Sequence, residues 1–257
     1  MAKIISIHSF RGGTGKSNTT ANVGSILASQ GLRVGIVDTD IQSPGIHVLF
    51  GIDEDSIKYS LNDYLWGRCN IQQAAVDVTP QLNLNPNNNV DVKGQVFLIP
   101  SSMRVGEIAR ILREGYDVGL LNEGYEQLTE ALELDVLMID THPGLNEETL
   151  LSIAISDALA IIMRPDQQDY QGTSVTVEVA RKLDVPRMFI IVNKTPPSLD
   201  LESVKKRVED SYNCPVAAVI PHSDELMTLA SSGIFTLQYP DNEVAQLYRQ
   251  SAQVLSS

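Results

Sequence analysis

Cysteine is scarce in this sequence: Cys69 and Cys214 are its two cysteines, and they form no Cys-x-x-Cys pair. This scarcity excludes a disulfide framework and indicates a reduced intracellular protein with two small buried thiols. Long uncharged hydrophobic runs, which a membrane span needs, are also missing. The first ten residues run directly into glycine; they are too short for a signal peptide and predict a buried strand instead.

Positive charge is in the minority, with 19 Lys and Arg against 32 Asp and Glu and a net charge of −13. A surface that coats nucleic acid uniformly is therefore disfavoured, because phosphate affinity needs concentrated positive charge. Two dense basic runs occur, Arg181-Lys182 and Lys205-Lys206-Arg207, both within predicted helices. They indicate either solvated helix faces with i,i+4 ion pairs or a DNA-phosphate patch that forms only in a dimer.

Short β-branched runs alternate with longer amphipathic segments, which predicts a mostly parallel sheet covered by helices on both faces. The expected strands are 4–7, 33–37, 96–99, 136–139, 158–163, 188–192 and 216–220. The expected helices are 16–29, 104–113, 116–132, 147–156, 171–183, 201–211, 224–230 and 242–255. The strands are hydrophobic along almost their whole length, as is typical of strands buried on both faces.

A chain of 257 residues can bury one large core, and a single domain over 1–257 is the simplest expectation. The last segment, 242–255, has apolar residues at helical spacing, so we expect one of its faces to dock on that core. Asparagine recurs around Pro86, and we interpret 81–89 as a polar surface loop.

The strongest motif lies between the first predicted strand and the first predicted helix. It reads Arg11-Gly12-Gly13-Thr14-Gly15-Lys16-Ser17. Glycines let the backbone turn its N–H groups around an anion, and a helix N-terminus adds a favourable dipole. Lys16 is then expected to reach the β- and γ-phosphates of a nucleotide, and the Ser17 hydroxyl to bind Mg²⁺. The alternative is a plain glycine turn, which the strand–loop–helix context disfavours.

The usual phosphate loop, GxxxxGK[ST], would place its first glycine where this chain has Phe10. With a basic residue before Gly-Gly, the loop resembles the deviant Walker A pattern KGGxGK[ST] of the MinD/ParA family. Further segments resemble that family in order and spacing, over nearly the whole chain: Asp38-Thr39-Asp40 with Ser43-Pro44, Asp140-Thr141-His142-Pro143-Gly144, Asn193-Lys194, and Pro221-His222-Ser223-Asp224. The resemblance implies an α/β, three-layer α/β/α P-loop NTPase fold with a mostly parallel central sheet.

Two aspartates, Asp38 and Asp140, end apolar strands at the edge of the sheet where ligands of open parallel sheets bind. We expect both to hold Mg²⁺ together with Ser17, because Mg²⁺ keeps several waters and needs few direct protein ligands. Helix capping or a turn role is the alternative. For Asp140 the following Pro143-Gly144 also fits a loop that senses the γ-phosphate.

Asp40 resembles the second aspartate of the family's DxD segment, which implies that it positions the attacking water. A solvated loop aspartate is the alternative. Arg11 stands where the family has a signature lysine that reaches across the dimer to the partner's nucleotide. Its charged, forked side chain could hold phosphate there. The role could instead be lost, or another lysine could supply the charge.

The cradle is expected to comprise Gly12, Gly13, Thr14, Gly15, Lys16, Ser17 and Asn18. Asn193 is expected to read adenine through its amide, with Pro221 and His222 closing the other side of the base; a strand-end turn residue is the alternative. His142 is expected to be a solvent-facing loop residue with no part in catalysis; a residue that reports the nucleotide state or contacts a partner is the alternative.

The resemblance implies that ATP or ADP binds with Mg²⁺ and that ATP brings two subunits together. The dimer then gains affinity for a surface and for a cargo adaptor or ATPase-stimulating protein. Cargo in such families includes plasmids, chromosomes, division machinery, flagella and carboxysomes, and some carboxysome-spacing relatives also depart at the signature lysine. The expected location is the cytoplasm of a bacterial-type cell, with nucleoid association as an open option.

Non-specific DNA is favoured as the surface by elimination. MinD-like membrane binders end in a basic amphipathic helix, whereas 243–257 here contains one basic residue, Arg249. Two alternatives stay open: a nucleotide-binding regulator or scaffold with little hydrolysis, and a membrane-associated MinD-like regulator of division or flagellar placement. An iron-protein relative is disfavoured, because no cysteine lies between Cys69 and Cys214.

Overall fold

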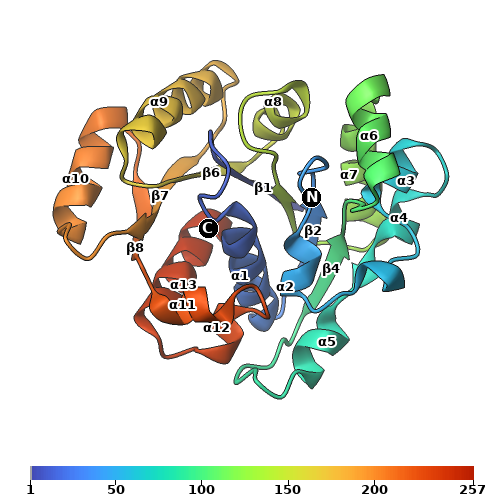
Figure 1. The fold of residues 1–257 in the computed structure, drawn as a ribbon, viewed down its shortest axis with the longest axis horizontal. Helices are drawn as coiled ribbons and strands as arrows, with labels where there is room; N and C mark the ends of the chain where they lie inside the picture. Colours follow the sequence, from blue (N-terminus) through green and yellow to red (C-terminus); the bar gives the residue numbers. More distant parts are fainter. Residues whose placement is uncertain (1) are drawn as a thin grey trace.

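An eight-stranded sheet runs through the molecule between two layers of helices (Figure 1). The computed structural model describes residues 2–257; Met1, where the expected domain begins, lies outside the described residues. The strands are β1 (Lys3–His8), β2 (Arg33–Asp38), β3 (Val76–Asp77), β4 (Gln95–Ile99), β5 (Val136–Asp140), β6 (Ala158–Met163), β7 (Met188–Thr195) and β8 (Val216–Pro221). Their order across the sheet is β3-β4-β2-β5-β1-β6-β7-β8.

Neighbouring strands are parallel except β3, which pairs antiparallel with β4 at one edge. The predicted α/β class with a mostly parallel sheet is therefore confirmed. The chain first extends the sheet on the β2 side of β1 and later continues on the β6 side. Such a reversal leaves a crevice at the carboxyl ends of the central strands, where ligands of open sheets bind.

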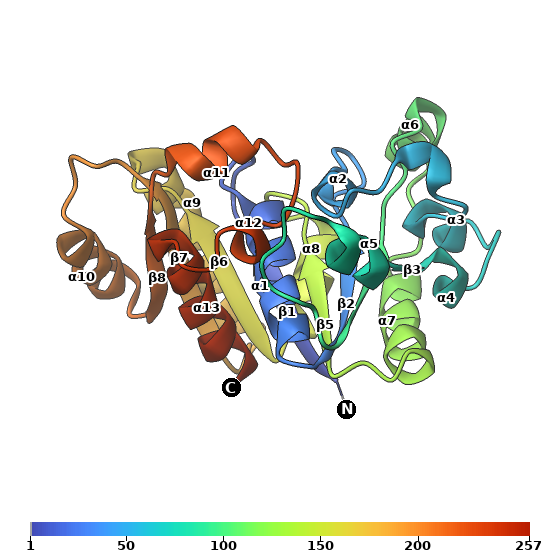
Figure 2. The same cartoon turned by 90° about the horizontal axis from the view of Figure 1, so that it is seen from below.

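Helices on one face of the sheet pack on Ile5, Ile7, Ile36 and Met138. They are α1 (Lys16–Ser29), α2 (Ile46–Leu49), α5 (Thr79–Leu84), α12 (Phe235–Gln238) and α13 (Glu243–Ser256). The other face carries α3 (Leu61–Leu65), α4 (Ile71–Ala74), α6 (Val105–Glu114), α7 (Gly119–Ala131), α8 (Glu147–Ala154), α9 (Gln167–Lys182) and α10 (Leu201–Tyr212). Figure 2 shows α11 (Asp224–Leu229) at the edge of the molecule where α2 and α6 also lie.

Because side chains alternate along a strand, both faces of each central strand must be apolar when both are covered. In β2, Val34 and Ile36 contribute to one core, and Val37 contributes to the other. The C-terminal helix α13 buries Val244, Tyr248, Ala252 and Leu255. The predicted docking of this helix on the core is therefore confirmed.

All seven expected strands and eight expected helices are present, with shifts of a few residues at their ends. The short elements between β2 and β4, which include η1 (Glu54–Ser56), were not predicted, and neither was α12. The prediction of a loop over 81–89 is wrong in its first part, since α5 extends to Leu84 and carries a proline in its first turn. Leu82 is buried in the core, and this tertiary contact stabilises a helix too short to stand alone.

Candidate nucleotide site

The glycine-rich loop lies at the carboxyl edge of the sheet, between the end of β1 at His8 and the start of α1 at Lys16. Gly13 and Gly15 have φ values of 76° and 104°, which favour glycine. Gly15 occupies the N-cap position of α1, so no side chain caps the helix, and no acidic residue lies in its first turn. The first N–H groups of α1 are therefore available for an anion. Lys16 is 6% exposed, so its charge is held close to this loop.

Two residues at the end of β7 hold the outer side of the loop. The Nδ2 of Asn193 donates to the carbonyl of Thr14 at 2.8 Å, and the Nζ of Lys194 donates to the carbonyl of Gly13 at 2.8 Å. With two successive carbonyls bound on the outside, the backbone of the loop is held in one arrangement. A Cβ on Gly15 would lie 2.4 Å from the Nδ2 of Asn193, so only glycine fits at this position.

The two strand-end aspartates are brought together, because Asp38 of β2 and Asp140 of β5 are register partners in adjacent strands. Asp38 accepts hydrogen bonds from the backbone N–H groups of Asp40 at 3.0 Å and Gly45 at 3.4 Å. Thr20 donates to one oxygen of Asp140 at 3.2 Å, while the buried second oxygen has no hydrogen-bond partner.

Burial and the neighbouring Asp140 raise the pKa of Asp38 well above its usual range. Burial also raises the pKa of Asp140 to about 6, although Lys16 acts in the opposite direction. Two buried carboxylates with an unpaired oxygen are unfavourable without a cation. Their oxygen donors suit Mg²⁺, and they lie beside the first turn of α1, which carries Ser17. The residues present therefore fit the metal that the sequence implies.

Asp40 lies in the loop after β2 and receives a hydrogen bond from the N–H of Ser43 at 3.2 Å. The Nε2 of His142 lies 3.9 Å from the Oδ1 of Asp40. Burial raises the pKa of Asp40, while His142 and Lys16 lower it. The side chain of His142, expected to face solvent, is 18% exposed and instead faces the aspartate expected to position water.

Arg11 points away from the cradle in this structure. Its guanidinium lies 3.4 Å from Asp169 and 3.6 Å from Asp166, both at the start of α9. Arg164 binds the same two carboxylates at 3.2 and 3.1 Å. The charge of Arg11 is therefore engaged within its own chain.

On the opposite side of the cradle lies a pocket of about 170 Å³, which adjoins Gly15 and Asn193. Asn18, Lys194, Pro221 and His222 line it together with residues of α11. The structure thus gathers every residue expected to contact the base around one pocket beside the glycine-rich loop. Sequence reasoning included Lys194 in this segment but gave it no role of its own.

Within residues 2–257, no group of three or more His, Cys, Asp and Glu side chains is arranged to hold a metal ion. Within the same residues, no helix combines the length and apolar character that crossing a membrane requires.

The model of a protein family described as AAA domain matches residues 2–186. An uncharacterized ATP-binding protein of Methanocaldococcus jannaschii is 26% identical over 99% of this chain and 88% of its own length. The septum site-determining protein MinD of Pyrococcus horikoshii, complexed with Mg-ADP, has a similar structure, with a TM-score of 0.77, 22% identity, and coverage of 99% of this chain and 96% of its own.

A complex of Cyanothece McdA with ATP gives a TM-score of 0.76 at 18% identity, covering 99% of this chain and 96% of its own. These two likenesses show the fold alone. The nucleotides in the two structures are ligands of those proteins. The family match extends over more than half of the chain and includes the glycine-rich loop and both strand-end aspartates. The chain therefore belongs to the AAA domain family, and the predicted membership of the MinD/ParA family of P-loop ATPases is confirmed.

Proposed function

We propose that this chain binds ATP with Mg²⁺ and hydrolyses it as a dimerisation switch that positions a cellular cargo. One observation carries the proposal. An uncapped, glycine-led helix start lies beside two adjacent buried aspartates, one of which has an unpaired oxygen. A triphosphate with its metal supplies what both features lack: an anion for the N–H groups and a cation for the carboxylates.

The backbone of Gly12, Gly13, Thr14 and Gly15 binds the phosphates, and Lys16 adds charge there. Ser17, Asp38 and Asp140 would hold Mg²⁺, which when bound would neutralise charge on the phosphate oxygens. Asn18, Asn193, Pro221 and His222 line the pocket that takes the base.

Asp40 orients the water that attacks the γ-phosphate, and the products are ADP and phosphate. Its position beside His142 supports this role, because the contact joins the loop after β2 to the loop after β5. Loops of this kind become ordered when a γ-phosphate is bound and are released when it is lost.

In the ATP state the protein is a homodimer that binds a surface and a cargo adaptor or ATPase-stimulating protein. Non-specific DNA is the proposed surface, with a cytoplasmic, nucleoid-associated location. Lys206 and Arg207 support this, since both are exposed on α10 and neither takes part in an ion pair in the described part of the chain. Membrane attachment through α13 is disfavoured, because its apolar residues are buried in the core.

A second candidate is a nucleotide-binding regulator with little hydrolysis. The engagement of Arg11 by Asp166 and Asp169 favours it, because a charge neutralised within its own chain is less available to a partner subunit's nucleotide. Phosphate release, alone and with DNA, distinguishes the two. If Asp40→Ala equals wild type under every condition, the regulator is the better description.

The nucleotide assignment is tested with Lys16→Gln, with Lys182→Gln as an exposed control of the same chemistry. We expect Lys16→Gln to lower ATP affinity at least about a hundredfold and to abolish ATP-dependent assembly, because a buried cation at the phosphates is lost. Titration calorimetry and size-exclusion chromatography, with ADP and with non-hydrolysable ATP, measure both effects. Equal affinity and assembly in Lys16→Gln and Lys182→Gln would overturn the assignment.

A further inference from the structure

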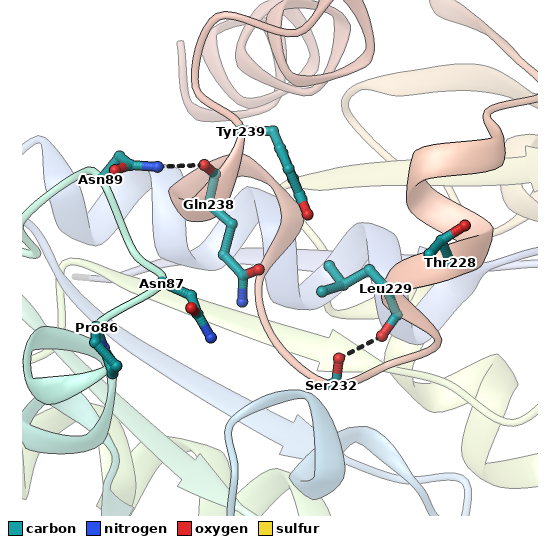
Figure 3. A pocket seen from close by; sticks show the side chains of 8 residues that line it. All are labelled: Pro86, Asn87, Asn89, Thr228, Leu229, Ser232, Gln238 and Tyr239. Atoms are coloured by element: carbon teal, nitrogen blue, oxygen red, sulfur yellow. Dashed lines mark hydrogen bonds between the residues drawn. The ribbon is translucent and has the colours of Figure 1, made fainter.

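A second cavity, of about 510 Å³, lies outside the candidate nucleotide site, between the loop after α5 and the segment that joins α11 to α12. Figure 3 shows the side chains that line it. They are Pro86, Asn87, Asn89, Thr228, Leu229, Ser232, Gln238 and Tyr239. The site proposed above for the nucleotide shares none of these residues.

The lining contains no charged side chain. It offers three carboxamides and three hydroxyls, with Leu229 and the 42% exposed ring of Tyr239 as apolar surfaces. A nucleic acid would need positive charge here, and a metal ion would need carboxylates or imidazoles. Carboxamides carry both donors and an acceptor, as a peptide group does, so they suit an uncharged peptide backbone.

One wall residue has an unused hydrogen-bond donor. Gln238 is 7% exposed, and its Nε2 is buried without a hydrogen-bond partner. Its side chain extends into the same space as that of Asn87, and Leu229 faces this space from α11 (Figure 3). A buried donor without a partner is costly. A ligand carbonyl would remove this cost if the side chain of Gln238 turned towards the cavity.

The loop that carries Asn87 is held in place. The N–H of Asn89 donates to the carbonyl of Leu237 at 2.7 Å, and its Nδ2 donates to the carbonyl of Gln238 at 2.6 Å. The cavity wall is thus fixed in part before any ligand arrives, which reduces the entropy lost on binding.

Helix α11 is a wall shared with the base pocket. Thr228 and Leu229 are among the residues that line the 510 Å³ cavity, whereas Leu226 and Met227 line the base pocket. The helix ends in two residues in the left-handed region, Ala230 and Ser231, with φ values of 48° and 65°. A small movement of α11 would therefore alter both cavities together.

We propose that this cavity binds an extended, uncharged peptide segment of a partner protein and that α11 couples its occupancy to the nucleotide. The proposal rests on the proposed function, since it assigns a docking site to the partner of the switch. The coupling is reciprocal: a ligand that binds more tightly to one nucleotide state also stabilises that state.

The test uses random linear peptides displayed on phage, selected against the full chain with ADP and with non-hydrolysable ATP. Enriched peptides are then synthesised and titrated against wild type and three variants. Asn87→Ala removes an exposed carboxamide, Thr228→Trp fills the cavity, and Gln81→Ala is an exposed control outside it. We expect uncharged peptides whose affinity falls about tenfold or more in the two cavity variants and is unchanged in the control.

We also expect peptide affinity to differ at least about threefold between the two nucleotide states, as a coupling of modest size would produce. An empty selection, or peptides that bind all three variants as they bind wild type, overturns the proposal. ATP titration of the same variants separates the two failures. If the cavity variants bind ATP normally and no peptide depends on the cavity, only the docking proposal fails; if wild type binds no ATP, the proposed function fails.

Discussion

Two carbonyl groups of the glycine-rich loop accept hydrogen bonds from residues that are far away in the sequence. Asn193 and Lys194 each donate a hydrogen bond to one carbonyl of the loop, at 2.8 Å. Asn193 was expected to read adenine, and that expectation stays a prediction. In the structure the amide of Asn193 has a second role, because it donates a hydrogen bond to the carbonyl of Thr14.

If Asn193 and Lys194 arrange the loop, both Asn193→Ala and Lys194→Met should weaken binding of ATP and of inorganic tripolyphosphate alike, by about threefold to tenfold each. Loss of a base contact alone would weaken ATP binding and leave tripolyphosphate unaffected. Calorimetric titration with both ligands measures the difference. Unchanged tripolyphosphate affinity in both variants would contradict the arrangement described here.

The buried Asp140 gives the nucleotide-free protein a stability cost that depends on pH. Its pKa in the folded state is raised to about 6, so the folded state binds its proton more tightly than the unfolded chain does. The free energy of unfolding therefore falls as pH rises from the ordinary carboxyl value towards 6, and the cost is fully present above it.

We expect Asp140→Asn to stabilise the metal-free and nucleotide-free protein at pH 8 by about 1 to 3 kcal/mol, because the variant buries no charge at this position. The gain should shrink towards pH 4. Thermal melts in EDTA at both pH values measure it, with the exposed Asp91→Asn as control. Equal melting temperatures for Asp140→Asn and wild type at pH 8 would count against this account.

At the scale of elements, the start of α9 holds the first part of the phosphate loop. Asp169, buried at 2% exposure, accepts hydrogen bonds from Arg11 and from the backbone N–H of Arg164. Phe10 packs against the same helix, since a Cβ on Gly172 would lie 2.2 Å from its ring. Phe10, which stands where the usual phosphate loop has its first glycine, therefore packs against α9.

This engagement predicts the outcome of Arg11→Ala. We expect a loss of about 0.5 kcal/mol in stability, because the ion pairs are partly exposed, and retention of ATP-dependent assembly. Denaturant unfolding and size-exclusion chromatography measure the two. If assembly is lost while stability is unchanged, Arg11 instead acts on the partner subunit's nucleotide.

Whole elements were predicted to different degrees. Both α1 and β6 have the predicted bounds, because glycines flank α1 in the sequence and β6 is an unbroken apolar run between charged residues. The short helices between β2 and β4 were missed, since four to six residues show too little periodicity. Their stability comes from contacts such as that of Leu82 with the core.

At the scale of the molecule, a net charge of −13 makes any DNA contact depend on local patches. If α10 supplies the patch, Lys206→Glu should weaken ATP-dependent DNA binding about tenfold at low salt, and wild-type binding should fall steeply as salt rises. Fluorescence anisotropy with a labelled duplex measures this, with Lys93→Glu as an exposed charge-reversal control. Identical binding by both variants would remove α10 from consideration.

The sequence by itself determined the fold class and the family, and it indicated the glycine-rich loop and the two strand-end aspartates as a nucleotide site, which stays a prediction. The fold class follows from the alternating apolar runs, whereas the family follows from the resemblance of the glycine-rich loop and the strand-end segments to those of known proteins. Only the tertiary structure decided where Arg11 points, which carbonyls Asn193 and Lys194 hold, and that α11 lies between two cavities. These depend on side chains that meet across more than 150 residues of chain, as Arg11 and Asp169 do. No local pattern encodes such contacts, because they arise when packing brings separate elements together.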